Sequence, residues 1–252
     1  MRKEIQGILF DFGGTLYDYY PSNSVIWSRI AKRLGVDISP NDPRIWKGMQ
    51  RQSIETTRRD KPFSKLSRVE IHTLNLHVLD ALGIDGEGTM EIISEEFDKR
   101  GHGYRINPES KETLERIYSM GLKIGLVSNC PSEFGKPRRQ TMRGDGVLQC
   151  FSAIILSGEV GHEKPEKEIF MIALNSLGLQ DASKVMHVGD SLGADVIGAQ
   201  NAGLIPVLYD PMGFHPGENV ITIQKLSDIA VSDIKKRAHG EYTYCTRKEV
   251  GK

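Results

Sequence analysis

The sequence predicts an α/β fold, in which a doubly wound parallel sheet is interrupted near its start by an all-helical segment. Strands and helices alternate from about residue 105 onward, which is typical of parallel sheets with right-handed crossovers. The stretch from about residue 17 to 104 has apolar residues at helical spacing and lacks strand periodicity. One short apolar strand precedes that stretch, so we expect the sheet domain to be discontinuous.

The first strand is an apolar run, Ile8–Phe10, that is followed by a carboxylate, Asp11, and soon after by two glycines. A wholly apolar run predicts a buried parallel strand, and glycines allow a sharp turn close to a ligand. Ligands of open α/β sheets bind at the carboxyl ends of the strands. Asp11 could therefore attack a phosphoryl or carbon centre, hold a cation, or do both. Alternatively, it could simply cap the turn.

The helical segment is predicted to contain about four helices. Two of them stop at a glycine, Gly35 or Gly83, which suits the C-terminus of a helix. The predicted helices span residues 25–34, 44–59, 69–82 and 90–97.

From Tyr104 onward, the predicted elements are those of a doubly wound sheet. In chain order they are helix 108–120, strand 122–128, helix 137–144, strand 153–157, helix 165–177, strand 184–189, helix 193–202, strand 204–209, strand 219–223 and helix 226–237. We expect a discontinuous core of residues 1–16 and 105–237, a helical insert of residues 17–104, and a loose polar tail of residues 238–252.

Composition and charge argue against several classes of partner. The chain has 252 residues, of which 38% are hydrophobic, and its 33 Lys and Arg residues equal its 33 Asp and Glu residues. This balance gives no reason to expect nucleic acid or an anionic membrane as a partner. No apolar run approaches the ~18–20 residues of a membrane span, and no signal-peptide pattern is present. We expect a cytoplasmic protein, and the sequence leaves its oligomeric state open.

The three cysteines, Cys130, Cys150 and Cys245, are too few and too scattered for a disulfide framework or a zinc site. Cys130 stands close to Ser128, so a catalytic thiol is one hypothesis. No histidine lies near it in the sequence, and a small packed residue is the preferred interpretation.

Three later segments also place polar residues at predicted strand ends. Strand 122–128 ends at Ser128, Lys164 stands just before a proline, and strand 184–189 leads into a loop that carries Asp190 and Asp195. Because the carboxyl ends of parallel strands share one edge, we expect these side chains to converge with Asp11. Taken singly, each has a simpler explanation: a serine in a turn, a surface lysine, or an acidic residue at a helix N-terminus.

The four segments together, in this order and spacing, resemble the haloacid dehalogenase (HAD) superfamily of phosphohydrolases. The resemblance covers roughly residues 4–20 and 105–225. It implies a Rossmann-like core, and it implies that the helical insert is a cap over the active site. It also implies a small phosphorylated molecule as the substrate.

The resemblance implies a role for each matched residue. Asp11 would be the nucleophile that forms an aspartyl phosphate, and Lys164 would neutralise negative charge in the transition state. The Ser128 hydroxyl and the Asn129 backbone amide would bind the phosphate.

The resemblance also implies Mg²⁺ as the cofactor. The Asp11 carboxylate, the Gly13 carbonyl and Asp190 would hold this hard cation. Asp195 and Thr15 would contact the residues that bind the metal and the substrate. Asp195 could pair with Lys164 or with a metal-bound water, and direct ligation is the less favoured alternative.

Position 13 departs from the family pattern. Family phosphatases usually carry a second aspartate there as general acid and base, and this chain has Gly13. General acid catalysis is typically worth ~10²–10⁴-fold. Three hypotheses follow: a Mg²⁺-dependent phosphatase, a HAD dehalogenase or phosphonate hydrolase, or a binding protein for phosphorylated metabolites with weak or no turnover.

Two groups of basic residues stand out, and the second of them could add positive potential near the site. Arg51, Arg58 and Arg59 lie on a predicted helix of the insert, and a second group follows Ser128 and consists of Lys136, Arg138, Arg139 and Arg143. For both groups, a solvated helix face is the preferred interpretation.

Overall fold

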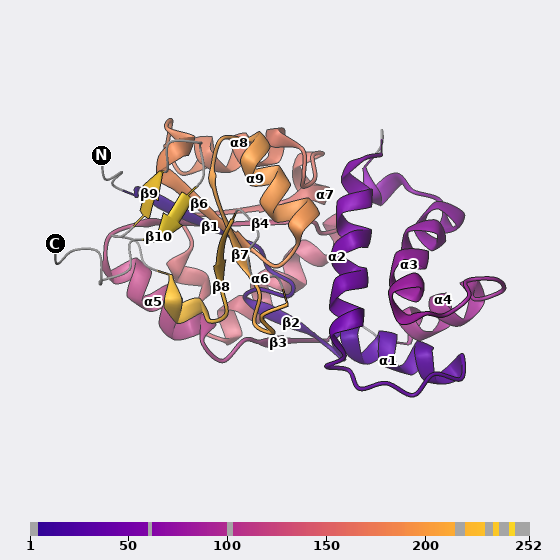
Figure 1. Cartoon of the computed structure of the whole chain (residues 1–252). Helices are drawn as coiled ribbons and strands as arrows, with labels where there is room; N and C mark the ends of the chain where they lie inside the picture. The colour runs from indigo at the N-terminus through magenta and orange to yellow at the C-terminus, as the bar shows by residue number, and fades with distance from the viewer. Residues whose placement is uncertain are drawn as a thin grey trace, which may run out of the picture. The chain divides into compact units, whose positions relative to one another are not determined.

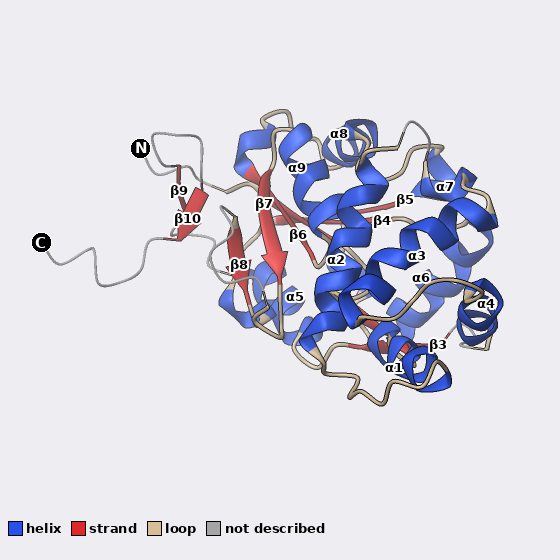
Figure 2. Ribbon diagram, turned by 45° about the vertical axis from the view of Figure 1, so that its right-hand side comes forward, coloured by secondary structure: helices blue, strands red, loops and turns tan. Residues whose placement is uncertain are grey.

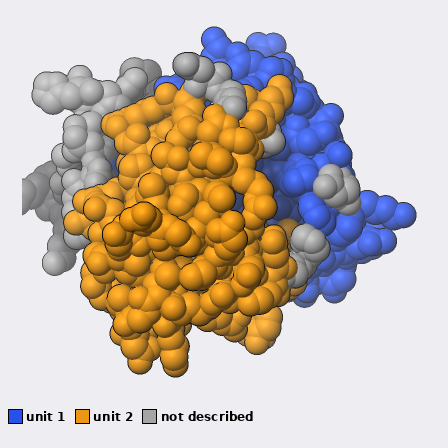
Figure 3. Space-filling view, turned by 90° about the vertical axis from the view of Figure 1, so that its right-hand side faces the viewer, with its two compact units in different colours: residues 1–17, 106–252 blue, residues 18–105 orange. Residues whose placement is uncertain are grey.

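The structure is a computed structural model that describes residues 5–59, 62–99, 103–214, 220–229, 234–236 and 242–244. The chain divides into two compact units (Figure 3). Residues 1–17 and 106–252 form the core unit, and residues 18–105 form the helical unit. Within the described residues, no helix is both long enough and apolar enough to cross a membrane.

A six-stranded parallel sheet forms the centre of the core unit (Figure 1). The strand order is β5-β4-β1-β6-β7-β8, so the first strand lies in the middle. The predicted doubly wound sheet is confirmed. Its strands are β1 (Gly7–Phe10), β4 (Lys123–Ser128), β5 (Ala153–Leu156), β6 (Val185–Gly189), β7 (Ile205–Tyr209) and β8 (Ile221–Ile223).

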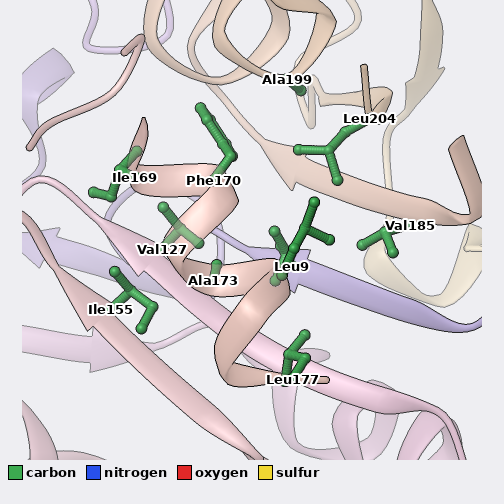
Figure 4. Close-up of a cluster of buried hydrophobic side chains, with 11 residues drawn as sticks. Leu9, Val127, Ile155, Ile169, Phe170, Ala173, Leu177, Val185, Ala199 and Leu204 are labelled. Carbon is green, nitrogen blue, oxygen red and sulfur yellow. The ribbon is translucent and has the colours of Figure 1, made fainter. Parts of the chain in front are cut away.

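Buried apolar side chains pack between the sheet and the helices of the core unit. Leu9, Val127 and Ile155, from three neighbouring strands, form one cluster with Phe170 of α8 (Figure 4). Every residue of β1 is buried, as expected for a central parallel strand. The helices of the core unit are α5 (Ser110–Ser119), α6 (Gly135–Gly144), α7 (Ser157–Val160), α8 (Lys167–Ser176) and α9 (Gly198–Asn201).

The helical unit contains the four predicted helices (Figure 2). They are α1 (Asn23–Arg33), α2 (Pro43–Thr57), α3 (Arg68–Leu82) and α4 (Met90–Asp98). Side chains of Ser22, Asp42 and Ser67 accept hydrogen bonds from the first turns of α1, α2 and α3. Trp27 and Val78 belong to the apolar cluster at the centre of this unit.

Two short strands at the ends of the insert were not predicted. β2 (Tyr17–Tyr20) pairs with β3 (Gly103–Ile106) in a separate two-stranded sheet. The two strands are separated in the sequence by the whole insert, so no local sequence pattern predicts that they pair. The insert is therefore helical between its ends and not throughout.

The predicted last helix, residues 226–237, is wrong. Residues Leu226–Asp228 form a single 3₁₀ turn, and β9 (Ile234–Lys236) pairs antiparallel with β10 (Tyr242–Tyr244). The Tyr-Thr-Tyr sequence of β10 favours a strand, and a strand partner overrides a weak helical pattern. The rest of the predicted loose tail, residues 238–241 and 245–252, lies outside the described residues, as does Cys245.

Candidate active site

Asp11 and Asp190 follow two adjacent strands at the same level of the sheet. Phe10 of β1 is in register with Val188 of β6, and the Asp11 backbone N–H donates to the Val188 carbonyl at 2.9 Å. The chain turns to opposite sides after these strands, which is where α/β sheets place ligands. Asp11 is buried, with 6% of its surface exposed.

The loop after Asp11 is a tight turn that lies against Asp190. The Tyr17 N–H donates to the Phe12 carbonyl at 2.8 Å, and Gly14 has a φ of +86°. A Cβ at Gly14 would lie 2.4 Å from Oδ2 of Asp190. Position 14 therefore requires glycine twice over, for its left-handed backbone and for the space that the carboxylate takes. Gly13 does not have a positive φ.

Lys164 links Asp11 to Asp195. Its ammonium donates to Oδ1 of Asp11 at 2.5 Å and to Oδ1 of Asp195 at 2.6 Å, and it is only 4% exposed. The backbone of Lys164 is fixed by the Asn129 side chain, which accepts from Lys164 N at 2.8 Å and donates to Lys164 O at 2.9 Å. The loop before α8 is thus tied to the end of β4.

Asp195 accepts hydrogen bonds on both carboxylate oxygens. Besides Lys164, its Oδ1 contacts Nε2 of His187 at 2.8 Å, and its Oδ2 accepts from Ser191 N at 3.0 Å. His187 is 1% exposed in β6. This arrangement orients Asp195 toward Lys164, and its carboxylate also belongs to the cluster with Asp11 and Asp190.

The site carries more negative than positive charge. Oxygen atoms of Asp11, Asp190 and Asp195 all lie within 4.8 Å of one another, and the Lys164 ammonium pairs with Asp11 and Asp195. Burial raises the pKa of Asp190 well above its usual value, and the charges of Asp11 and Asp195 add to this. Burial also raises the pKa of Asp11, although Lys164 opposes the increase.

The other two pKa values move toward the charged forms. Burial alone would raise the pKa of Asp195, but Lys164 and His187 outweigh it and hold the pKa below its usual range. Burial would lower the pKa of Lys164, but Asp11 and Asp195 outweigh it and raise the pKa above its usual value. An ion pair between Lys164 and Asp195 therefore persists at neutral pH.

The residues fit a hard divalent cation. The converging donors are carboxylate oxygens, which Mg²⁺ prefers, and no cysteine or histidine atom belongs to this cluster in the described part of the chain. A cation would also offset the repulsion that raises the pKa of Asp190. Asp11 and Asp190 are the residues that would hold it.

Ser128 lies buried at the end of β4, the strand next to β1. Its Oγ accepts a hydrogen bond from Nη1 of Arg138 at 2.7 Å. Thr15, expected in a supporting position near the site, is buried, and its backbone carbonyl accepts from Asn107 at 3.3 Å. Its hydroxyl makes no hydrogen bond within the described residues. Cys130 is buried, in keeping with a packed residue.

Sequence reasoning missed two buried residues, His187 and Arg138. His187 interrupts an otherwise apolar strand, which is a signal that a buried polar contact must exist. Arg138 was grouped with its basic neighbours. Its spacing from Met142 places both on one face of the helix, and this face is buried.

Comparisons with known proteins agree on one family. A family model described as haloacid dehalogenase-like hydrolase matches residues 5–203. Ribulose-1,5-bisphosphate 5-phosphatase of Halopiger xanaduensis is 28% identical over 213 residues, which are 81% of this chain and 84% of that protein. Phosphoserine phosphatase of Thermus thermophilus is 30% identical over 144 residues, 57% of this chain and 54% of that protein.

A solved structure shares the fold. It is that of the HAD-hydrolase YfnB of Bacillus subtilis, described as putative and as bound to magnesium. Its TM-score is 0.57 at 20% identity, covering 90% of this chain and 97% of that chain.

Proposed function

The chain belongs to the haloacid dehalogenase-like hydrolase family, and we propose that it is a Mg²⁺-dependent phosphatase of a small phosphorylated metabolite. The observation that carries this proposal is a buried carboxylate, Asp11, held by Lys164 at the strand ends and lying beside Asp190. Two relatives that are named as phosphatases of small metabolites support the same reaction class.

In the proposed reaction, an Asp11 oxygen attacks the phosphorus and the bond to the leaving oxygen breaks. Water then attacks the aspartyl phosphate, which releases inorganic phosphate and regenerates Asp11. Lys164 favours the charged form of Asp11 against the effect of burial, fixes its orientation through the hydrogen bond to Oδ1, and would balance charge that develops on the phosphoryl oxygens. The Ser128 hydroxyl binds one of these oxygens.

Mg²⁺, held by Asp11, Asp190 and the Gly13 carbonyl, would supply positive charge that draws the substrate phosphate to Asp11. Asp195 acts through Lys164, because its oxygens already accept bonds from that ammonium, from His187 and from Ser191. The helical unit, residues 18–105, would act as a cap that selects the substrate.

Gly13 offers no side chain to protonate the leaving oxygen. Esters whose leaving group needs no proton should therefore react fastest. Gly13 is also compatible with two alternative functions. The first is a dehalogenase or phosphonate hydrolase, and the second is a binding protein without fast turnover.

A panel of aryl and alkyl phosphates, assayed with Mg²⁺ and with EDTA, tests the proposal. We expect turnover only with Mg²⁺ and higher rates for aryl esters. Halide release from 2-haloacids in EDTA would identify a dehalogenase. Thermal stabilisation by phosphate esters without turnover would identify a binding protein.

A further inference from the structure

Arg138 differs from the other basic residues of α6. Its three basic neighbours, together with Glu159, line a surface groove: Lys136, Arg139 and Arg143. Arg138 is only 3% exposed. It shares the buried face of the helix with Gly135 and Met142, so this guanidinium is built into the core unit rather than solvated.

The contact between Arg138 and Ser128 determines which group donates the hydrogen bond between them. Nη1 of Arg138 lies 2.7 Å from Oγ of Ser128. A guanidinium can only donate, whereas a hydroxyl has one donor hydrogen and two acceptor lone pairs. The Ser128 oxygen is therefore the acceptor, and its own hydrogen is left for another acceptor. Donation from a cation also polarises the hydroxyl and strengthens it as a donor.

A stack of rings fixes the guanidinium. The Arg138 guanidinium carbon lies 4.6 Å from the centre of the Phe12 ring, and Phe12 stacks on Tyr17 with a centroid distance of 4.4 Å and an interplanar angle of 8°. Phe12 and Tyr17 are fully buried. Phe12 directly follows Asp11, so Arg138 is held by the loop that carries the nucleophile while it bonds to the neighbouring strand end.

We propose that Arg138 is a positioning residue that turns the Ser128 hydroxyl toward the phosphate group of the substrate. This inference rests on the proposed phosphatase function. Arg138 would act through Ser128, and its planar group suits the task because it can lie flat on Phe12 while donating at its edge. A lysine ammonium, which is compact and not planar, would not reproduce this geometry.

A double-mutant cycle tests the inference. The dissociation constant of inorganic phosphate is measured by titration calorimetry with Mg²⁺ present, together with its competitive inhibition constant, for four proteins: parent, Ser128→Ala, Arg138→Met and the double variant. Hydrogen bonds to charged groups are worth about tenfold or more in affinity. We expect each single variant to weaken phosphate binding about tenfold, and the double variant to be no weaker than Ser128→Ala alone.

Arg143→Met is the matched control, because Arg143 is an exposed arginine on the same helix. It should leave phosphate binding unchanged. Thermal unfolding of every variant identifies losses that follow from reduced stability. If Arg138→Met does not fold, the same cycle is carried out with Arg138→Lys, which keeps the buried charge. We expect Arg138→Lys to weaken phosphate binding as well, because the ammonium does not reproduce the geometry of the guanidinium.

Three outcomes overturn the inference. Unchanged phosphate binding in Arg138→Met would show that the Ser128 hydroxyl does not need Arg138 in order to bind phosphate. A double variant that is about a hundredfold weaker would show that Arg138 acts independently of Ser128. A parent protein that neither hydrolyses phosphate esters nor binds phosphate would overturn the proposed function as well, whereas in the first two cases that function stands.

Discussion

The core unit and the helical unit differ in how deeply their ion pairs are buried. In the core unit, Lys164 and Asp195 form an ion pair whose side chains are 3% and 2% exposed. In the helical unit, Arg51 pairs with Asp80, and these side chains are 47% and 78% exposed. Buried charges are costly to maintain, and surface pairs contribute little. The core unit maintains a costly cluster in which both partners are buried, whereas in the helical unit even the buried Glu96, 9% exposed, pairs with Arg33, which is 37% exposed.

The strongest test of this contrast is a substitution of Asp11, the proposed nucleophile. Asp11→Asn removes the negative charge while keeping the size of the side chain. We expect turnover to fall to below a few per cent of the parent value, with unfolding still cooperative, and both are measured on the same preparation. Asp37→Asn, an exposed residue of the helical unit, should have no effect. Substantial activity in Asp11→Asn would mean that another residue attacks the substrate.

Lys164→Met should have the next largest effect, on stability as well as on rate. It leaves Asp11 and Asp195 buried without their cation, and breaking a buried pair typically costs about 3–5 kcal/mol. Urea unfolding measures this cost. Lys184→Met is the control, since Lys184 lies 4.0 Å from Asp181 at the surface. Similar losses in both variants would contradict the contrast between buried and exposed charge.

Gly13→Asp should raise the rate on alkyl phosphates by about 10²-fold if the missing proton donor limits turnover. The backbone at Gly13 does not have a positive φ, so a side chain brings no left-handed strain. Rates are compared for a series of leaving groups, alongside the melting temperature. A stable variant with unchanged rates, from a parent without leaving-group dependence, would show that the proton comes from elsewhere.

The pKa of Asp190 predicts how pH affects the metal-free protein. Burial raises this pKa above 3.8, so the folded state binds a proton more tightly than the unfolded state. Asp190 therefore lowers stability as pH rises from about 4 through the raised pKa. In EDTA, we expect Asp190→Asn to lose less stability over this range than the parent, and to need more Mg²⁺ for activity. Equal pH dependence of the two melting temperatures would refute this prediction.

The smallest effect is expected for the exposed basic cluster of the helical unit. Arg51→Met should change stability by less than about 0.5 kcal/mol and leave kcat/KM for small phosphate esters unchanged. Urea unfolding and steady-state kinetics measure the two quantities. An increase in KM without a loss of stability would instead show that Arg51 contacts the substrate, and would move recognition onto this cluster.

Much of the core unit could be predicted because its signals are local. Apolar runs such as Ile8–Phe10 predicted the strands, and the parallel sheet then brought Asp11, Lys164 and Asp190 to one edge. The same logic predicted that Asp195 would pair with Lys164 as one possibility, and this is the contact observed.

Features that depend on distant partners could not be predicted. β2 and β3 pair across the whole insert, and the β9 strand depends on β10. The burial of Arg138 depends on Phe12 and Ser128, which stand far from it or on another element. The Asn129 side chain holds the backbone of Lys164, a contact that only tertiary structure creates, and this contact leaves the expected role of the Asn129 backbone amide a prediction.

The pairing of β2 with β3 has a consequence for how the chain folds. β1 must find β4 across more than the length of the insert, and closing a long loop costs entropy before any contact compensates. The helices of the insert form from local contacts, and its two ends are paired strands. Once the insert has folded, Tyr17 and Ile106 are already neighbours. The entropy that must be lost when β1 pairs with β4 is then that of closing a much shorter loop.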